Sequence, residues 1–108
     1  MRNMIFAGAI LSATITMAAS SELGLASYYQ NPHYSGLIAA HKTLPFGSLV
    51  KVVNIDNGRS AMLKIVDRGP FIRGRIIDVS PFAADLLGFR KAGVARVRIE
   101  TSGGAEPL

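Results

Sequence analysis

The chain has 108 residues, which is enough for one domain and too few for two. It contains no cysteine, so disulfide bonds and lipid attachment through a cysteine are excluded. Twelve Lys and Arg residues against seven Asp and Glu give a net charge of +5, which favours anionic partners.

The first nineteen residues have the order of a secretory signal peptide. Arg2 precedes an uncharged, mostly apolar run from Ile5 to Met17, and small residues follow. This run is shorter than the roughly twenty residues that span a bilayer. We therefore expect residues 1–19 to be a signal peptide, cleaved after Ala18 or Ser20, rather than a membrane anchor.

Export determines which anionic partners we expect. Loss of Arg2 leaves eleven basic and seven acidic residues, a net charge of +4. Outside the cytoplasm, wall polymers or lipid surfaces are the expected partners, and nucleic acid is not. We expect a protein of the periplasm or cell envelope, with no lipid anchor and no stable membrane insertion after cleavage.

The folded part begins with a strand that ends in two tyrosines, Glu22 to Gln30. Tyr28 and Tyr29 are expected on opposite sides of it, because successive side chains of a strand alternate. The cluster NPHYSG that follows predicts a turn. Its His33 and the later His41 lack cysteine companions and make a poor zinc site, so we expect no metal and no cofactor.

Two further strands, Leu49–Ile55 and Ser60–Val66, are rich in Val, Ile and Leu. The pair Asn57-Gly58 between them predicts a tight hairpin turn with positive φ at both residues. Asp67 follows the second strand directly, so it is expected at the end of the hairpin opposite the turn.

The stretch VDRGPFIRGRIIDVS, from Val66 to Ser80, holds two candidate catalytic carboxylates, Asp67 and Asp78. Its Gly and Pro residues predict an irregular loop, and another strand begins near Arg75. Such a loop places a carboxylate at the mouth of a sheet, where ligands bind. The alternative is a solvated turn with surface ion pairs.

One short helix is predicted from Ser80 to Phe89. Ser80 is suited to the N-cap and Gly88 to the C-terminal stop. Phe82 and Leu86 are four residues apart, and we expect this face to pack against the core.

The last strand is predicted over Val94–Glu100, where apolar residues alternate with charged ones. Residues 101–108 show no periodicity and are expected to form a disordered tail. About six short strands and a single helix favour an all-β fold. A closed barrel removes the exposed edges of such a sheet, so we expect a six-stranded barrel across residues 22–100.

Three strings in this order resemble the rare lipoprotein A family: GLASYYQ, AAHKTLPFGSLVKVVNIDNGRS and KIVDRGPFIRGRIIDVSPFAADLLGF. The resemblance extends from Gly24 to about Glu100. It implies a double-psi β-barrel, distantly similar to expansins and barrel-type endoglucanases. It also implies lytic transglycosylase activity on peptidoglycan glycan strands stripped of peptides, which leaves anhydromuramic ends.

Carried over position by position, the resemblance implies Asp67, His41 and Asp78 as catalytic residues, with Asp67 as the acid and His41 assisting. One carboxyl group suffices in such a reaction, because a hydroxyl of the sugar itself is the nucleophile. Seven residues are expected to contact the glycan: Ser27, Tyr28, Tyr29, Lys42, Thr43, Arg68 and Phe71.

Two other roles are compatible with the sequence. The family's longer segment before AAHKT contains a Gly-Glu pair, whereas no glutamate lies between Glu22 and Glu100 here. This motivates a non-catalytic, expansin-like module that grips peptidoglycan through its aromatic residues, including Tyr34 and Phe46. A barrel that serves only as the partner of another envelope protein has no sequence feature in its favour.

Overall fold

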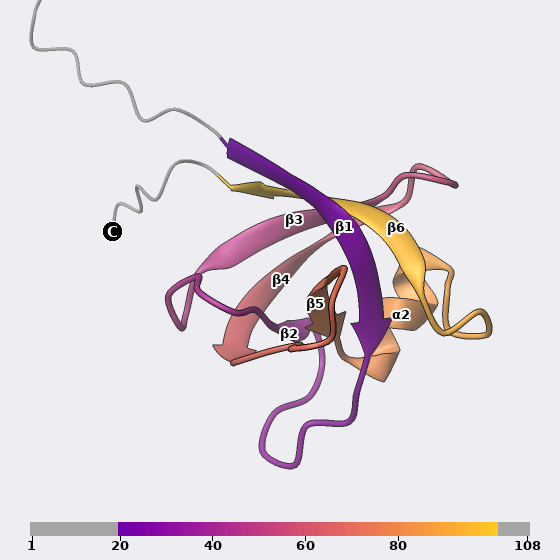
Figure 1. The fold of residues 1–108 in the computed structure, drawn as a ribbon. Coiled ribbons are helices and arrows are strands. Elements are labelled where there is room, and N and C mark those ends of the chain that lie inside the picture. Colours follow the sequence, from indigo (N-terminus) through magenta and orange to yellow (C-terminus); the bar gives the residue numbers. More distant parts are fainter. Residues whose placement is uncertain (1–19, 102–108) are drawn as a thin grey trace, which may run out of the picture.

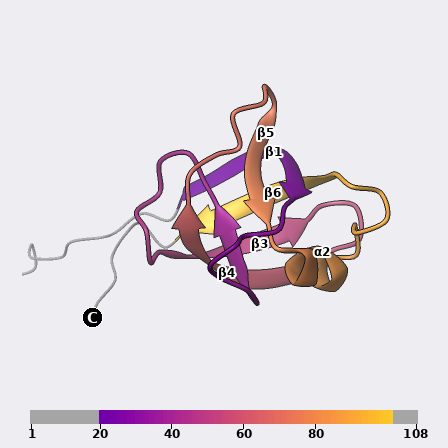
Figure 2. The same cartoon turned by 90° about the horizontal axis from the view of Figure 1, so that it is seen from below.

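The structure is a computed structural model that describes residues 20–101. Its elements are β1 (Ser20–Tyr28), β2 (Ile38–Ala40), β3 (Leu49–Asn54), β4 (Ser60–Asp67), β5 (Arg75–Val79), α2 (Pro81–Leu87) and β6 (Ala95–Thr101). The strands close into a barrel in the order β1-β5-β2-β4-β3-β6 (Figures 1 and 2). The prediction of a six-stranded barrel with one short helix is confirmed.

The strand pairing brings residues that are distant in the sequence to the same end of β2. β1 runs parallel to β5 and β2 parallel to β4, while the remaining pairs are antiparallel. Ala40 on β2 is the register partner of Asp67 on one side and of Asp78 on the other. Neighbouring strands lie about 4.8 Å apart, so the backbones of the two aspartates are about 10 Å apart.

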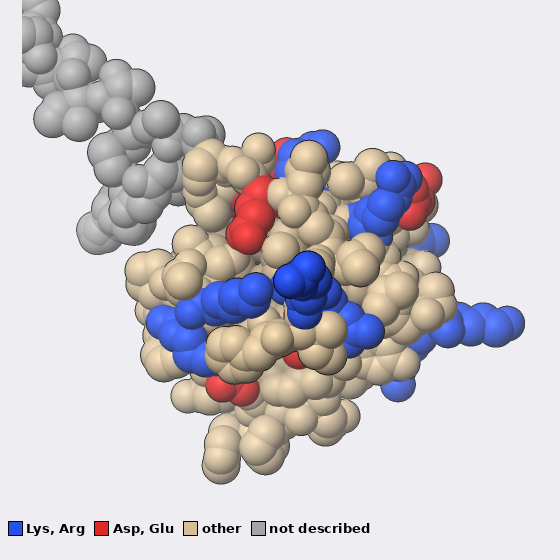
Figure 3. All heavy atoms as spheres, viewed as in Figure 1, with Lys and Arg blue, Asp and Glu red and all other residues tan. Residues whose placement is uncertain are grey.

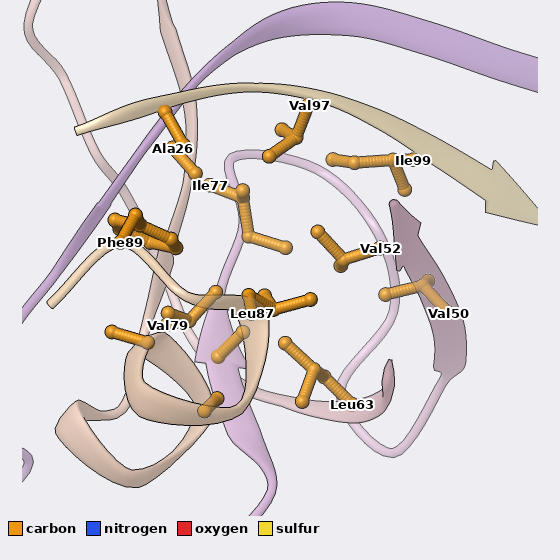
Figure 4. Packing of buried hydrophobic residues seen from close by; sticks show 14 of the residues in the cluster. Ala26, Val50, Val52, Leu63, Ile77, Val79, Leu87, Phe89, Val97 and Ile99 are labelled. Carbon is orange, nitrogen blue, oxygen red and sulfur yellow. The ribbon is translucent and has the colours of Figure 1, made fainter. Parts of the chain in front are cut away.

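The barrel interior is filled by alternate side chains of the strands (Figure 4). Ala95 and Val97 of β6 are buried, whereas Arg96 between them is exposed, as the alternation predicts. Gly24 on β1 is required by close packing, because a Cβ there would lie 2.6 Å from the side chain of Ile76. The strands that carry the site therefore rest on a close-packed core.

Helix α2 begins and ends as predicted but packs through a different face. The Ala83 N–H donates to Ser80 Oγ at 3.1 Å, and Gly88 ends the helix with φ 80°. Phe82 and Leu86 are 52% and 45% exposed, so the prediction that they pack inward is wrong. The buried face consists of Ala83, Ala84 and Leu87, whose two small residues let the helix approach the barrel closely.

The hairpin between β3 and β4 is wider than the predicted two-residue turn. The Asn54 N–H donates to the Arg59 carbonyl at 2.8 Å, which leaves residues 55–58 as a four-residue loop. Gly58 has the expected positive φ of 78°. The Asn54 side chain explains the longer loop, since it accepts from the Asp56 N–H at 3.0 Å and donates to the Leu87 carbonyl at 2.9 Å.

The ends of the barrel domain also differ slightly from the prediction. Thr101 belongs to β6, not to the tail, because it pairs with Ser20 at the start of β1. The predicted signal peptide and the tail after Thr101 lie outside the described residues. Between residues 20 and 101, no helix is long and apolar enough to cross a membrane.

Candidate functional site

Asp67 ends β4 at the rim of the barrel, with its carboxylate partly exposed. Its Oδ2 accepts from the Tyr29 hydroxyl at 3.0 Å and the Asn31 amide at 3.3 Å, and its Oδ1 accepts from the Arg68 N–H at 2.8 Å. In residues 20–101, no Lys or Arg forms an ion pair with it. The carboxylate is therefore oriented by three donors while one edge stays open to solvent.

Asn31 connects this carboxylate to the turn after β1. Its side chain is buried, and Nδ2 also donates to the Tyr29 hydroxyl at 2.8 Å. Its Oδ1 accepts the backbone N–H groups of His33 and Tyr34 at 2.7 and 2.9 Å. The Asn31 side-chain amide thus stabilises the turn and orients the Asp67 carboxylate.

The Tyr29 phenol keeps its proton because of its surroundings. Burial raises the pKa of Tyr29 above its ordinary value of 10.0, the Asn31 amide acts in the opposite direction, and the charges of Asp67 and Asp78 raise it further. The phenol therefore stays a donor toward Asp67 at neutral pH. Asp78 lies on the opposite side of Ala40 from Asp67, so its charge adds to this effect.

Asp78 faces β1 across the parallel β1–β5 pair. Its Oδ1 accepts a hydrogen bond from the hydroxyl of Ser27, which is a buried residue and its register partner. A carboxylate with one oxygen engaged inside the barrel wall has less freedom to reach a ligand than Asp67. Its geometry suits support of the cluster.

His41 lies beside Asp67 through its backbone, but its ring points elsewhere. The His41 N–H donates to the Asp67 carbonyl at 3.0 Å. The ring belongs to a buried residue, and Nε2 lies 2.9 Å from Oε1 of Glu22, a half-exposed carboxylate on β1. Nδ1 accepts the N–H groups of Thr43 and Leu44, each at 3.1 Å.

Arg68, which follows Asp67 in the chain, has its side chain bound to the turn that begins at His41. Its Nη1 donates to the carbonyls of His41 and Leu44 at 3.2 and 2.8 Å. Its guanidinium carbon lies 4.1 Å from the centre of the Phe46 ring, which is a cation–π distance. The positive charge is thus directed away from the neighbouring carboxylate.

A hollow of about 210 Å³ opens beside Asn31. It lies between the turn after β1 and the start of α2, and Tyr34 and Phe82 are the aromatic residues that line it, 54% and 52% exposed. None of its lining residues is charged. An uncharged cleft with aromatic walls, connected to Asp67 through Asn31, suits a sugar ring better than an ionic ligand.

The predicted site residues separate into two groups. Asp67, Asp78, Ser27 and Tyr29 come together in one cluster. Tyr28 does not join it: its ring packs 6.2 Å from that of Phe89, and its hydroxyl donates to the Arg90 carbonyl on the helix side. The remaining predicted contacts, Lys42, Thr43, Arg68 and Phe71, are exposed.

Basic side chains are prominent on one face of the molecule. Figure 3 shows Lys and Arg forming a band across the face seen in Figure 1, with few acidic side chains between them. Lys42, Lys64 and Arg73 are exposed and form no ion pair with any acid in residues 20–101. In the same range, no cluster of three or more His, Cys, Asp or Glu side chains could hold a metal ion.

Two residues of the site were missed by sequence reasoning. The pattern NPHYSG predicts Asn31 only as part of a turn, although an Asn side chain often accepts backbone N–H groups two or three residues further on. The sequence gives no signal for its second role, because Asp67 is 36 positions away. No sequence pattern indicates a role for Glu22, because its contact with His41 forms only when the barrel closes.

The barrel and this cluster can be compared with known proteins. Residues 22–99 match the family described as lytic transglycolase. The chain belongs to this family.

Curated relatives of this chain include the endolytic peptidoglycan transglycosylase RlpA of Pseudomonas aeruginosa, 49% identical over 73 residues, which are 68% of this chain and 20% of that protein. RlpA of Vibrio cholerae is 58% identical over 64 residues, 59% of this chain and 24% of that protein. A probable RlpA of Nostoc sp. is 57% identical over 67 residues, 62% of this chain and 18% of that protein. The chain thus spans about a fifth of the length of these relatives.

Solved structures confirm the double-psi β-barrel. A mutant of Clavibacter michiganensis expansin, in complex with cellohexaose, superposes with a TM-score of 0.63 at 15% identity, covering 82% of this chain and 54% of that one. A Streptomyces papain inhibitor superposes with a TM-score of 0.61 at 22% identity, covering 76% of this chain and 94% of that one. At these identities the likeness concerns the fold alone.

Proposed function

We propose that this protein is an enzyme that cleaves peptidoglycan glycan strands and leaves anhydromuramic ends. The observation that carries the proposal is the Asp67 carboxylate, oriented by Tyr29 and Asn31 and open at the barrel rim. The names of the curated relatives support the substrate and the reaction. Peptide-stripped strands are the proposed substrate.

Asp67 acts first as an acid and then as a base in this proposal. Its carboxyl group protonates the oxygen between two sugars, and the bond from that oxygen to C1 breaks through an oxocarbenium-like state. The carboxylate then takes the proton from a hydroxyl of the same sugar, whose oxygen bonds to C1. Asp67 ends protonated, so the cycle closes without a water molecule or a second carboxylate.

The glycan needs surfaces on both sides of Asp67. The uncharged hollow between Tyr34 and Phe82 offers one sugar-sized place beside Asn31. Exposed Phe71 and Lys42 offer contacts around the site. Tyr34→Ala is expected to raise the KM for glycan strands with little change in kcat. Leu86→Ala is the matched control, because it removes an exposed side chain of α2 that does not line the hollow.

The enzyme is tested with purified protein and amidase-treated sacculi, by measuring anhydro-sugar products. We expect Asp67→Asn to lower product release by roughly 10²–10⁴-fold. Asp85→Asn neutralises an exposed aspartate on α2 and is expected to act like the parent. Product release by Asp67→Asn equal to that of the parent would exclude Asp67 as the acid, and no anhydro products from the parent would exclude the enzyme.

A non-catalytic, expansin-like wall-binding module is the second candidate. It is favoured by the exposure of aromatic residues, with Phe46 61% and Phe71 78% exposed, and by the cellohexaose complex of the expansin neighbour. Sedimentation with sacculi distinguishes the two: strong binding that leaves the strands intact supports this candidate. Either function places the protein at the cell envelope, which is our proposal for its location.

A further inference from the structure

The contacts of His41 fix which of its ring nitrogens carries the proton. Nδ1 accepts two backbone N–H groups, from Thr43 and Leu44, so it carries the lone pair. The proton therefore sits on Nε2 and is donated to Glu22 Oε1 at 2.9 Å. With both nitrogens engaged in a buried residue, the neutral ring has no free position from which to exchange a proton with substrate.

The same ring determines the shape of the turn that follows it. Because the N–H groups of Thr43 and Leu44 point at the ring, the turn folds around it, and the carbonyls of His41 and Leu44 both face the Arg68 guanidinium. The Phe46 ring covers the guanidinium from the other side. Arg68 thus has three contacts: two are carbonyls of the turn that His41 organises, and the third is the Phe46 ring, two residues beyond that turn.

Arg68 matters because it directly follows Asp67 in the chain. A guanidinium beside a carboxyl group lowers the carboxyl pKa by about one to three units, which opposes its use as an acid. The other titratable groups around Asp67 are Tyr29, Asp78 on β5 and His41 after β2, and none of these is a cation that replaces Arg68. The position of Arg68 therefore contributes to the positive charge that Asp67 faces, together with the exposed Lys42, Lys64 and Arg73.

We propose that Glu22 is a positioning residue: through the His41 ring it holds the turn of residues 41–44 in the form that captures Arg68, and so keeps the guanidinium off Asp67. This rests on the proposed function of Asp67 as the acid. It assigns His41 a supporting role instead of proton transfer. Glu22, His41 and Arg68 are then connected in series, because Glu22 binds the His41 ring and Arg68 binds the His41 carbonyl.

The test compares two substitutions at one half-exposed position. Glu22→Gln keeps an oxygen that accepts from Nε2–H, whereas Glu22→Leu does not. The direct readout is a carbon-detected NMR titration of the Asp67 carboxyl, which needs no activity. We expect the midpoint in Glu22→Leu to lie roughly one unit or more below that in Glu22→Gln. Both variants lose the Glu22 charge, so its direct effect on Asp67 is matched.

Arg68 is then removed in the same background. In Glu22→Leu combined with Arg68→Leu, the midpoint is expected to return toward that of Glu22→Gln. Combination with Arg73→Leu, which removes another exposed cation, is expected to leave it low. Equal midpoints in the two Glu22 variants, or recovery with Arg73→Leu as complete as with Arg68→Leu, would overturn the proposal.

The pH profile of product release separates this inference from the proposed function. We expect activity of Glu22→Leu to decline at lower pH than that of Glu22→Gln on the alkaline side, by the shift seen in the titration. An Asp67→Asn variant as active as the parent would exclude Asp67 as the acid, yet the NMR midpoints would still decide the position of Arg68. Shifted midpoints with an unchanged activity profile would show that Glu22 positions Arg68 but that Asp67 is not the acid.

Discussion

Replacing Asn31 by alanine tests whether one buried amide supports both the turn after β1 and the acid. Four hydrogen bonds end on its side chain, two to backbone N–H groups and two to the Tyr29 and Asp67 oxygens. Each hydrogen bond contributes about 1 kcal/mol net. The two backbone donors lie in an exposed turn and regain water, so we expect Asn31→Ala to cost about 2–4 kcal/mol of unfolding free energy.

The assay is thermal unfolding followed by circular dichroism, with product release measured on the same samples. For a domain of this size the loss corresponds to a drop of roughly 10–20 °C in Tm. Gln30→Ala, at the exposed neighbouring position, is the control and is expected to change stability by less than about 0.5 kcal/mol. We also expect activity per folded molecule to fall, because Asp67 loses a donor that orients it.

Asn31→Asp separates the two roles. It keeps an oxygen for the His33 and Tyr34 N–H groups but replaces the donor facing Asp67 by a second carboxylate. Two adjacent carboxylates raise the pKa of the pair, so folding of this variant takes up a proton and its stability rises as pH falls from 7 toward 4. If Asn31→Ala melts within about 2 °C of the parent, the amide does not hold the site together.

Three further predictions concern single contacts. Gly58→Val is expected to lower the unfolding free energy by about 1–2 kcal/mol through backbone strain alone, because φ is 78° and no atom lies within 4 Å of a new Cβ. Gly58→Asn should cost much less, because Asn tolerates this conformation. Equal Tm values for the two variants would refute the strain at Gly58. Gly24→Ala is expected to cost about 1–3 kcal/mol through its 2.6 Å contact with Ile76, and Ile76→Ala should make the same substitution nearly neutral in a double-mutant cycle. Because the folded pKa of Tyr29 is raised above 10.0, the unfolded chain loses this proton first, so its contribution to stability is present below pH 10.0 and lost as pH rises through the folded pKa. Asp67→Asn should lower this pKa toward the ordinary value, as an NMR titration of the Tyr29 ring can show.

Much of the fold follows from local sequence patterns. The alternation in β6, the cap at Ser80 and the glycine at Gly88 each have a local physical cause, and each is found where it was predicted. The predicted helix face is wrong because a spacing of four fits Phe82 with Leu86 and Ala83 with Leu87 equally well. Only the approach of the barrel decides between them, and it favours the second pair.

The site could be predicted only in part for a related reason. The motif around Asp67 identifies a carboxylate in a loop, but its donors come from the turn after β1. The turn at residues 55–58 was misjudged because Asn54 binds the end of α2, a contact that the local Asn-Gly pattern does not contain. Glu22 reaches His41 only because β1 closes the barrel. Contacts between distant segments are what local patterns leave undetermined.

The pairing of Ser20 with Thr101 bears on how such a barrel can be used in larger proteins. The described chain enters and leaves the barrel at neighbouring positions on adjacent antiparallel strands (Figure 1). A domain with adjacent ends can be inserted into a loop of another protein without stretching either one. Its rim, where Asp67 lies, stays intact in such an insertion, because no site residue is needed for the junction. The adjacent ends give a physical reason for the barrel to serve as a module within larger proteins. In the curated relatives, the matched region is about a fifth of the protein's length.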